Sequence, residues 1–226
     1  MKRKWMMGVG GALMAVPFFA GPAGAQEVDP IDPSVALQAI MDNLWVFIAG
    51  VLVFLMQAGF AMLEAGLTRA KNIGNIMAKN LADAAIGILA FYLLGYGLAY
   101  GAGGGSLVGW GSFALSGSDL FPDPTGGLTP ATDFFFQAMF AATAVTIASG
   151  AMAERTKFST YLVFSVFATA LIYPIVVHWT WGGGFITDIN IGDAVYSDFA
   201  GSTIVHSVGG WAALVDAWST NREICT

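Results

Sequence analysis

Residues 41–63 read MDNLWVFIAGVLVFLMQAGFAML, an almost uninterrupted apolar run. A helix needs about 20 consecutive, predominantly apolar residues to cross a hydrocarbon layer about 30 Å thick. This run is therefore predicted to be a transmembrane helix. Four further apolar runs of sufficient length follow, at approximately 79–101, 130–152, 158–180 and 200–218. We predict an all-α fold, a polytopic membrane helix bundle of about five transmembrane helices with a membrane domain over 41–218.

The composition agrees with a membrane protein and argues against several other classes. Of the 226 residues, 56% are hydrophobic and 11% are charged, and the mean hydropathy is +0.68. Soluble domains carry about 25% charged residues. A net charge of −6 disfavours a nucleic-acid partner, which would need a basic patch. The sequence has a single cysteine and contains no nucleotide loop, zinc-binding helix or nucleophile elbow. We therefore expect no enzyme activity, catalytic residue, cofactor or metal site.

Residues 1–25 have the pattern of a signal peptide. Basic residues occupy positions 2–4, residues 5–20 are apolar, and Ala23-Gly24-Ala25 is a small-residue cleavage site. The alternative is an uncleaved first span, which the short length of the run and Pro17 disfavour. Cleavage would leave residues 26–40 as an N-terminal segment before the first helix.

The distribution of charges predicts the orientation in the membrane. Outside the predicted signal peptide, every Lys and Arg falls in alternate connections between the runs: Arg69, Lys71, Lys79, Arg155, Lys157 and Arg222. Loops 102–129 and 182–198 contain Asp but no Lys or Arg. The positive-inside rule therefore places these loops outside, the mature N-terminus in the periplasm and a short end at 219–226 in the cytoplasm of a bacterial inner membrane.

Two polar residues in or beside the fifth run are functional candidates. His206 lies about a third of the way into the run, and a neutral imidazole can donate at one nitrogen and accept at the other. It suits a pore for protons or small polar solutes, although a histidine that only packs between helices is an equally good interpretation. Asp198 precedes the run and is expected first as a helix N-cap and second as a charge that favours a cation nearby.

Other polar and aromatic residues have simpler interpretations. Glu64, near Arg69, and Glu154, beside Arg155, are expected to form ion pairs or to set topology. His178 is expected to be an interfacial anchor. Aromatic residues gather at the predicted outer ends of the third and fourth runs, where they form either an interfacial belt or a cation–π site. These residues are Phe134, Phe135, Phe136, Phe140, Trp179 and Trp181.

Several motifs resemble the ammonium transporter family, the Amt/Mep/Rh group. The stretch QAGFAMLEAG at 57–66, with Arg69, Lys71 and Asn72, resembles the family's first-helix signature. FQAMF at 136–140, AER at 153–155, HWTWGGG at 178–184 and DFAGSTIVH at 198–206 agree in order. The resemblance covers nearly the whole chain after residue 25.

The resemblance implies a homotrimer of eleven-helix subunits, each with its own pore, built from two inverted halves of which the first has five helices. It implies that Phe140 and Trp181 help to recruit ammonium, that Phe136 and Phe140 lie near an aromatic gate, and that His206 is a pore histidine that supports deprotonation. Asp198 matches an acidic residue near the recruitment site. It also implies a PII-type regulatory partner for a cytoplasmic tail.

The family's second half would supply a partner histidine, another gate aromatic and that tail, and none of these is in the 226 residues. We therefore expect the N-terminal half only, with 219–226 a truncated end. Transport of ammonium or ammonia is the leading interpretation. An ammonium-sensing membrane domain of a signalling protein and a non-conducting remnant are the alternatives.

Overall fold

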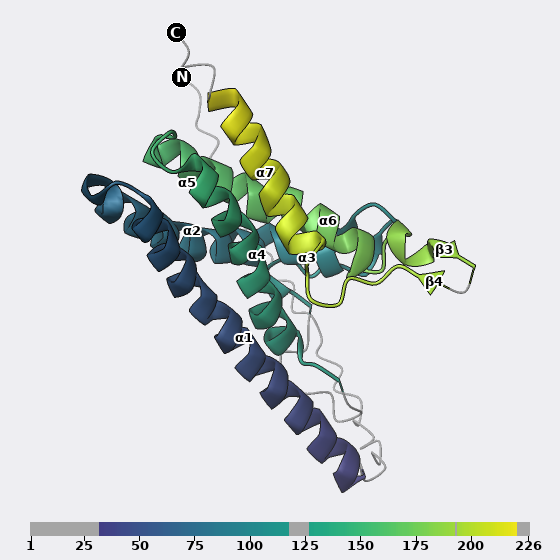
Figure 1. The fold of residues 1–226 in the computed structure, drawn as a ribbon. Helices are drawn as coiled ribbons and strands as arrows, with labels where there is room; N and C mark the ends of the chain where they lie inside the picture. Colours follow the sequence, from purple (N-terminus) through teal and green to yellow (C-terminus); the bar gives the residue numbers. More distant parts are fainter. Residues whose placement is uncertain (1–31, 118–126, 193, 221–226) are drawn as a thin grey trace, which may run out of the picture. The chain divides into compact units, whose positions relative to one another are not determined.

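The computed structural model describes residues 32–117, 127–192 and 194–220. The predicted signal peptide, residues 26–31 and residues 221–226 lie outside these ranges, so the predictions made for them remain predictions. Figure 1 shows the arrangement of the helices. The α-helices are α1 (Pro33–Leu67), α2 (Ile73–Ala90), α3 (Tyr96–Tyr100), α4 (Pro130–Met152), α5 (Phe158–Phe167), α6 (Tyr173–Thr180) and α7 (Ile204–Thr220).

Short helical segments join these helices into longer rods. A 3₁₀ turn, η1 (Ala70–Asn72), leads into α2, and a π-helical segment, η2 (Phe91–Gly95), joins α2 to α3. A second π-helical segment, η4 (Ala168–Ile172), joins α5 to α6. Within the described ranges, four helical stretches are long and apolar enough to cross a membrane: Pro33–Leu67, Ala70–Tyr100, Pro130–Met152 and Phe158–Asp188. With the 17-residue α7, they confirm the predicted all-α membrane bundle of about five helices.

The two π-helical segments pack against each other at Gly95, which has no side chain. A Cβ atom added to Gly95 would lie 2.5 Å from the carbonyl oxygen of Thr169 and 2.9 Å from Cγ of Pro174. The Thr169 hydroxyl donates to the carbonyl of Ser165 over 2.8 Å, so it partners its own helix. The absence of a side chain at position 95 therefore allows the second and fourth rods to approach closely.

The loops that were predicted to lie outside contain short, paired strands. In the first, β1 (Gly103–Gly104) pairs antiparallel with β2 (Gly109–Trp110), and a 3₁₀ turn, η3 (Phe113–Leu115), follows. In the second, a 3₁₀ turn, η5 (Phe185–Asp188), leads to β3 (Asn190–Ile191), which pairs antiparallel with β4 (Ala194–Val195). Each loop therefore contains a short antiparallel hairpin within its described residues.

Helix α4 is the centre of the packing and contacts α1, α2 and α7. Its inward residues are small, and the following are at most 2% exposed: Ala138, Ala141, Ala142, Thr143, Ala144, Val145, Thr146, Ala148 and Ser149. Small side chains let membrane helices approach one another. By contrast, α1 exposes large apolar side chains such as Trp45 (75%) and Leu67 (80%). Such a face is suited to hydrocarbon rather than to water.

Two boundaries differ from the sequence prediction. Helix α1 begins at Pro33, before the apolar run at 41, because Asp32 caps it by accepting from the Ser34 N–H over 2.9 Å. Helix α7 begins at Ile204 rather than at 200, because residues 199–203 form turns around Gly201, whose φ is +82°. Capping and turn geometry set both boundaries, and hydropathy does not report either.

One charge was assigned wrongly. Lys79 was counted with the basic connection that follows the first helix, but it lies within α2 and is 1% exposed. Its Nζ atom donates to the carbonyl of Ser149 over 3.1 Å. Lys79 is therefore a buried polar group, and the charge asymmetry of the connections rests on the remaining Lys and Arg residues.

Candidate functional site

Three of the predicted aromatic residues form one contiguous group between α4 and the end of α6. The rings of Phe136 and Phe140 meet edge to face, with centroids 4.9 Å apart, and Phe140 meets Trp181 at 5.9 Å and 71°. Neighbouring aromatics point elsewhere: Phe135 stacks on Phe47 of α1, and Phe134 packs against Phe91. Of the predicted aromatic cluster, the structure therefore brings together the three residues that the family resemblance selected.

Trp181 connects this group to the start of α7. Its indole Nε1 donates a hydrogen bond of 2.6 Å to the main-chain carbonyl of Asp198. A Cβ atom added to Gly201 would lie 3.1 Å from the Trp181 ring, so the glycine leaves room for the indole. The aromatic group and the turn before α7 are consequently held in fixed register.

Asp198 organises that turn. Its carboxylate accepts from the N–H groups of Gly201 (2.8 Å), Thr203 (2.9 Å) and Ile204 (2.7 Å), and the residue is 9% exposed. These are N–H groups at the beginning of α7, where the helix dipole favours a negative charge. The geometry is that of a cap, and it places a carboxylate beside the carbonyl that holds Trp181.

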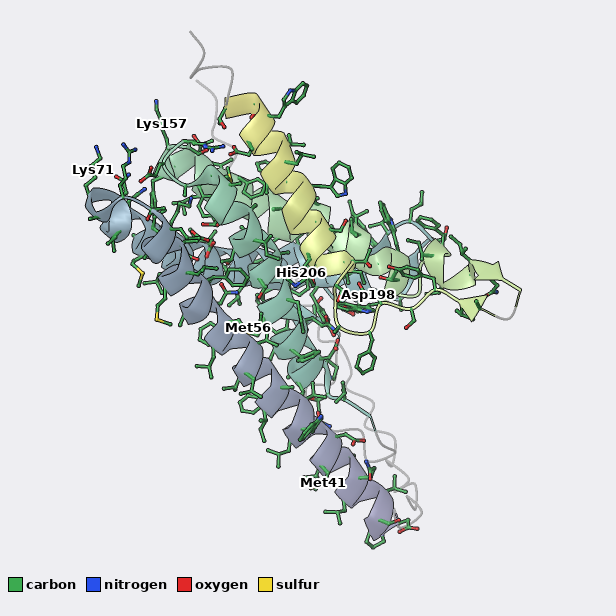
Figure 2. The ribbon with its side chains drawn as sticks, viewed as in Figure 1. Met41, Met56, Lys71, Lys157, Asp198 and His206 are labelled. Atoms are coloured by element: carbon green, nitrogen blue, oxygen red, sulfur yellow. The ribbon has the colours of Figure 1, made fainter. Side chains whose placement is uncertain are left out.

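His206 lies closer to the helix start than hydropathy indicated. It is the third residue of α7, and its main-chain N–H donates to the carbonyl of Gly201 over 3.2 Å. Its side chain is exposed in this chain, and within the described ranges its imidazole makes no hydrogen bond. Figure 2 shows His206 and Asp198 near each other at the start of the helix. The imidazole is thus available to a ligand or to a partner group.

His178 is buried within the protein. It is 5% exposed, and its Nδ1 and Nε2 atoms lie 2.7 Å from the carbonyl of Ala99 and 2.9 Å from that of Gly105. The imidazole therefore links α6 to the end of α3 and to the first outer loop. Its expected role as an anchor at the membrane interface remains a prediction.

Of the two glutamates expected to form ion pairs or to set topology, Glu154 forms an ion pair and Glu64 is buried among polar groups. Glu154 pairs with Arg69 (2.9 Å) and not with the adjacent Arg155, because Glu154 has a φ of +63° that turns it toward the connection between α1 and α2. The Asn72 side chain (2.7 Å) and the Arg69 main-chain N–H (2.9 Å) also donate to it, and these bonds lower the pKa of Glu154. Glu64 is not paired with Arg69: it is 6% exposed and accepts from Asn80 and Ser149.

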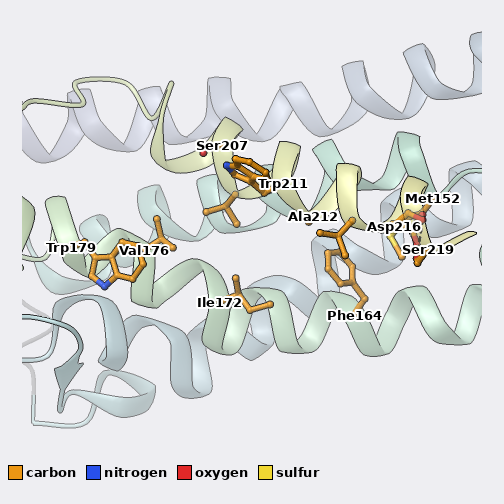
Figure 3. A pocket seen from close by; sticks show the side chains of 12 residues that line it. Met152, Phe164, Ile172, Val176, Trp179, Ser207, Trp211, Ala212, Asp216 and Ser219 are labelled. Carbon is orange, nitrogen blue, oxygen red and sulfur yellow. Dashed lines mark hydrogen bonds between the residues drawn. The ribbon is translucent and has the colours of Figure 1, made fainter.

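An apolar groove runs along α7. It has a volume of about 600 Å³, and Figure 3 shows Phe164, Ile172, Val176, Trp211 and Ala212 along its walls. Asp216 lines one end and accepts from the Thr156 hydroxyl over 3.4 Å. Asp216 therefore has a polar partner in the α4–α5 connection.

Sequence reasoning missed a buried polar network among α1, α2, α4 and α5. Lys79 and Asp83 are four residues apart and so share one face of α2, a spacing that could have indicated it. Gln57 contributes from α1, where its amide donates to Thr143 over 3.0 Å and its carbonyl accepts from Thr146 over 2.8 Å.

The comparisons with known proteins agree with the fold. The Ammonium Transporter Family model matches residues 44–225. Ammonium transporter Amt2 of Archaeoglobus fulgidus is 46% identical over 179 residues, which are 77% of this chain and 37% of that protein. Ammonium transporter Amt1 of Haloferax mediterranei is 42% identical and covers 83% of this chain and 36% of that protein.

Solved structures give the same assignment. A structure titled "Sensor Amt Protein" superposes with a TM-score of 0.74 at 37% identity, covering 81% of this chain and 45% of the other. Candida albicans Mep2 superposes with a TM-score of 0.66 at 28% identity, covering 76% and 37%. The chain belongs to the ammonium transporter family and has the fold of its N-terminal half. It spans less than half the length of these relatives.

Proposed function

We propose that this chain forms one half of a transmembrane conduit for ammonium and ammonia. The observation that carries the proposal is the linked set Phe140, Trp181, Asp198 and the start of α7, which joins two aromatic rings, a carboxylate and an available imidazole. Relatives with 42–46% identity bear the name ammonium transporter, which supports the same substrate.

The chemistry of the set suits a weakly acidic cation. Aromatic faces attract a cation by about 0.5–2 kcal/mol each, and Phe140 and Trp181 are two such rings. Asp198 adds a negative charge nearby, although its main task is to cap α7. In a narrow apolar passage an ammonium ion would lose its hydration at a large cost, whereas neutral ammonia loses far less. We infer that the rings recruit ammonium and that His206 assists its deprotonation. Ammonia then passes through the conduit while its proton is transferred separately, so one positive charge crosses for each ammonium taken up.

Phe136 extends the aromatic group and is proposed to act with Phe140 as a gate. Potassium carries the same charge as ammonium but has no proton to give up, so a passage based on deprotonation would reject it. We further propose a homotrimeric assembly, a periplasmic mature N-terminus in a bacterial inner membrane, and a PII-type partner for any cytoplasmic tail. The orientation follows from the Lys and Arg residues of the connections.

Uptake of methylammonium tests the proposal. The complete protein that includes this chain would be produced in cells that lack their own ammonium carriers, as wild type and as Trp181→Ala and His206→Ala. We expect uptake by the wild type and a loss of at least about tenfold in each variant, since each removes a group that contacts the substrate. Trp110→Ala, at an exposed position in the first outer loop, is the control. Uptake that survives both site substitutions would contradict the assigned roles.

A sensing role is the second candidate, because one superposed structure is titled "Sensor Amt Protein". The same recognition set would then bind ammonium to change the activity of an attached or associated signalling module. Measurement of flux and of signalling output in the same preparation distinguishes the two. Flux that is lost in His206→Ala supports the transporter, and an ammonium-dependent output without flux supports the sensor. A protein that reaches the membrane but shows neither would be a non-conducting remnant.

A further inference from the structure

A second group of polar residues lies within the bundle, apart from the aromatic and histidine site. Glu64 comes from α1, Lys79 and Asp83 from α2, Ser149 from α4 and Tyr161 from α5. Each is at most 6% exposed. Ionisable residues inside a membrane bundle are costly and are functional candidates by default.

The hydrogen bonds connect these residues into one cluster. Glu64 Oε2 accepts from Ser149 Oγ over 2.8 Å and from Asn80 over 3.1 Å. The Tyr161 hydroxyl donates to Asp83 Oδ2, and the Thr146 hydroxyl donates to the same oxygen over 3.4 Å. Lys79 Nζ lies 4.3 Å above the centre of the Tyr161 ring. The Ser149 hydroxyl therefore lies on Glu64 and the Tyr161 hydroxyl on Asp83, with Lys79 in contact with both Ser149 and Tyr161.

The charges in the cluster do not balance. Two carboxyl groups, Glu64 and Asp83, face a single ammonium group, Lys79. Arg69 is not available, because it pairs with Glu154 outside the cluster. Asp216 of α7 also interacts with Lys79, but it faces Arg155 as well, and α4 contributes hydroxyl groups and no ionisable side chain. Both carboxyl groups cannot be ionised in so dry a site without a large cost.

The hydrogen bonding of the carboxyl oxygens agrees with this excess of carboxyl groups over ammonium groups. Among the described residues, Glu64 Oε1 and Asp83 Oδ1 have no hydrogen-bond partner. A carboxylate oxygen that is buried without a donor is unfavourable, whereas a protonated carboxyl group needs one donor fewer. One of the two carboxyl groups can therefore bind a proton at an oxygen that accepts no hydrogen bond from the other side chains.

Glu64 also lines a pocket of about 450 Å³ between the α1–α2 and α4–α5 connections. Gly150 leaves this side open: a Cβ atom there would lie 4.0 Å from Glu64 Oε1. Arg69, Glu154 and Arg155 are among the pocket residues, on the side that the charge distribution makes cytoplasmic. Glu64 is thus the carboxyl residue of the cluster that lines this pocket, while Asp83 is 0% exposed and lies behind it.

We propose that Glu64, Lys79 and Asp83 form a proton-binding site, which holds one proton between its two carboxyl groups and exchanges it with the cytoplasm through this pocket. Water delivers the proton to Glu64.

Infrared difference spectroscopy of the purified complete protein in lipid nanodiscs tests the site without any transport. The carbonyl stretch of a carboxylic acid is measured at neutral pH in wild type, Glu64→Gln, Asp83→Asn and Lys79→Met. Removal of either carboxyl group leaves the other paired with Lys79 and ionised, so the cluster's acid band should disappear in both variants. Removal of the ammonium group should leave two acids and about double the band. Asp133, a half-buried carboxyl group elsewhere, contributes equally to all samples and cancels in the differences.

A band that is unchanged in both Glu64→Gln and Asp83→Asn, or that does not grow in Lys79→Met, would overturn the proposal. Circular dichroism checks that each variant keeps its helices. If one of them does not, Gln57→Glu is measured in its place: it should add a second carboxylic acid to the same network and so enlarge the acid band. The route is tested by hydrogen–deuterium exchange of the band. Gly150→Ala should slow it severalfold and Gly74→Ala, where a Cβ meets nothing within 4 Å, should not. Equal rates would rule out the pocket as the route.

Discussion

The indole of Trp181 and the main chain of Asp198 are joined by a hydrogen bond of 2.6 Å, although the residues lie on opposite sides of the second outer loop. The same Asp198 uses its carboxylate to hold the first N–H groups of α7. The aromatic contact of Trp181 with Phe140 is therefore coupled to the position of the helix that carries His206. Recognition and conduction in the proposed pathway share one structural link.

Replacement of Trp181 by Phe should weaken this link and keep an aromatic ring. The variant loses the indole hydrogen bond, worth about 0.5–1.5 kcal/mol. The methylammonium concentration that gives half-maximal uptake should therefore rise about 2- to 10-fold. Trp179→Phe is the matched control, because its Nε1 donates to Leu107 in an exposed bond of 3.0 Å. Concentration-dependent uptake measures both. Equal effects of the two substitutions would show that the bond of Trp181 has no special role.

Loss of the Asp198 carboxylate should destabilise the start of α7. Asp198→Ala removes an acceptor from three N–H groups, and we expect a loss of about 1–3 kcal/mol and a lower melting temperature in detergent. Asp198→Asn keeps one carbonyl oxygen and should lose less. Asp32→Ala, which removes the cap of α1, should leave methylammonium uptake intact. If Asp198→Ala melts like the wild type, the capping account is wrong.

The contact between the two π-helical segments predicts a steric effect. Gly95→Ala would place a methyl group 2.5 Å from a carbonyl oxygen, and such overpacking costs about 1–3 kcal/mol. Gly74→Ala, in the helix α2 with open space around it, should instead stabilise by about 0.5–1 kcal/mol. Thermal unfolding of the two variants compares them directly. A gain in stability from Gly95→Ala would refute the close packing of the rods.

The folded conformation of the connection between α4 and α5 should become less stable as the pH falls. Hydrogen bonds from Asn72 and from the Arg69 main chain lower the pKa of Glu154 below that of a free glutamate, about 4.3. A lowered pKa stabilises the folded arrangement above the free value, and this contribution is lost as pH falls through the lowered pKa. Limited proteolysis at 68–72 should therefore accelerate in acid. Glu154→Gln should be cleaved quickly at neutral pH already, and a variant that resists cleavage would contradict this role.

Much of the fold could be predicted from the sequence, because transmembrane helices need long apolar runs and such runs are easily recognised in a sequence. The ends of α1 and α7 could not, since Asp32 and Gly201 set them through capping and a positive φ rather than through hydropathy. The π-helical segments also leave no mark in the apolar pattern, because they depend on contacts between rods such as Gly95 with Thr169.

The candidate site was predictable in part for a related reason. Phe136, Phe140 and Trp181 were selected from the aromatic residues by motif resemblance, whereas residue type and position in or beside the fifth run already indicated Asp198 and His206. The structure joins the three aromatic residues to one another and to Asp198 through pairwise contacts. Lys79 was misplaced because charge asymmetry treats every cation as part of a connection. Its burial between Ser149 and Tyr161 depends on three helices that are distant in the sequence.

The proposed conduction of ammonium is tested most directly by current measurements on liposomes that contain the complete protein. A sudden rise in ammonium concentration should produce a transient current in the wild type, and an equal rise in potassium should produce none. His206→Ala should abolish the ammonium current, whereas Ser207→Ala, on the neighbouring position of α7, should keep it. Equal currents from potassium and ammonium, or a full ammonium current in His206→Ala, would contradict the proposed pathway.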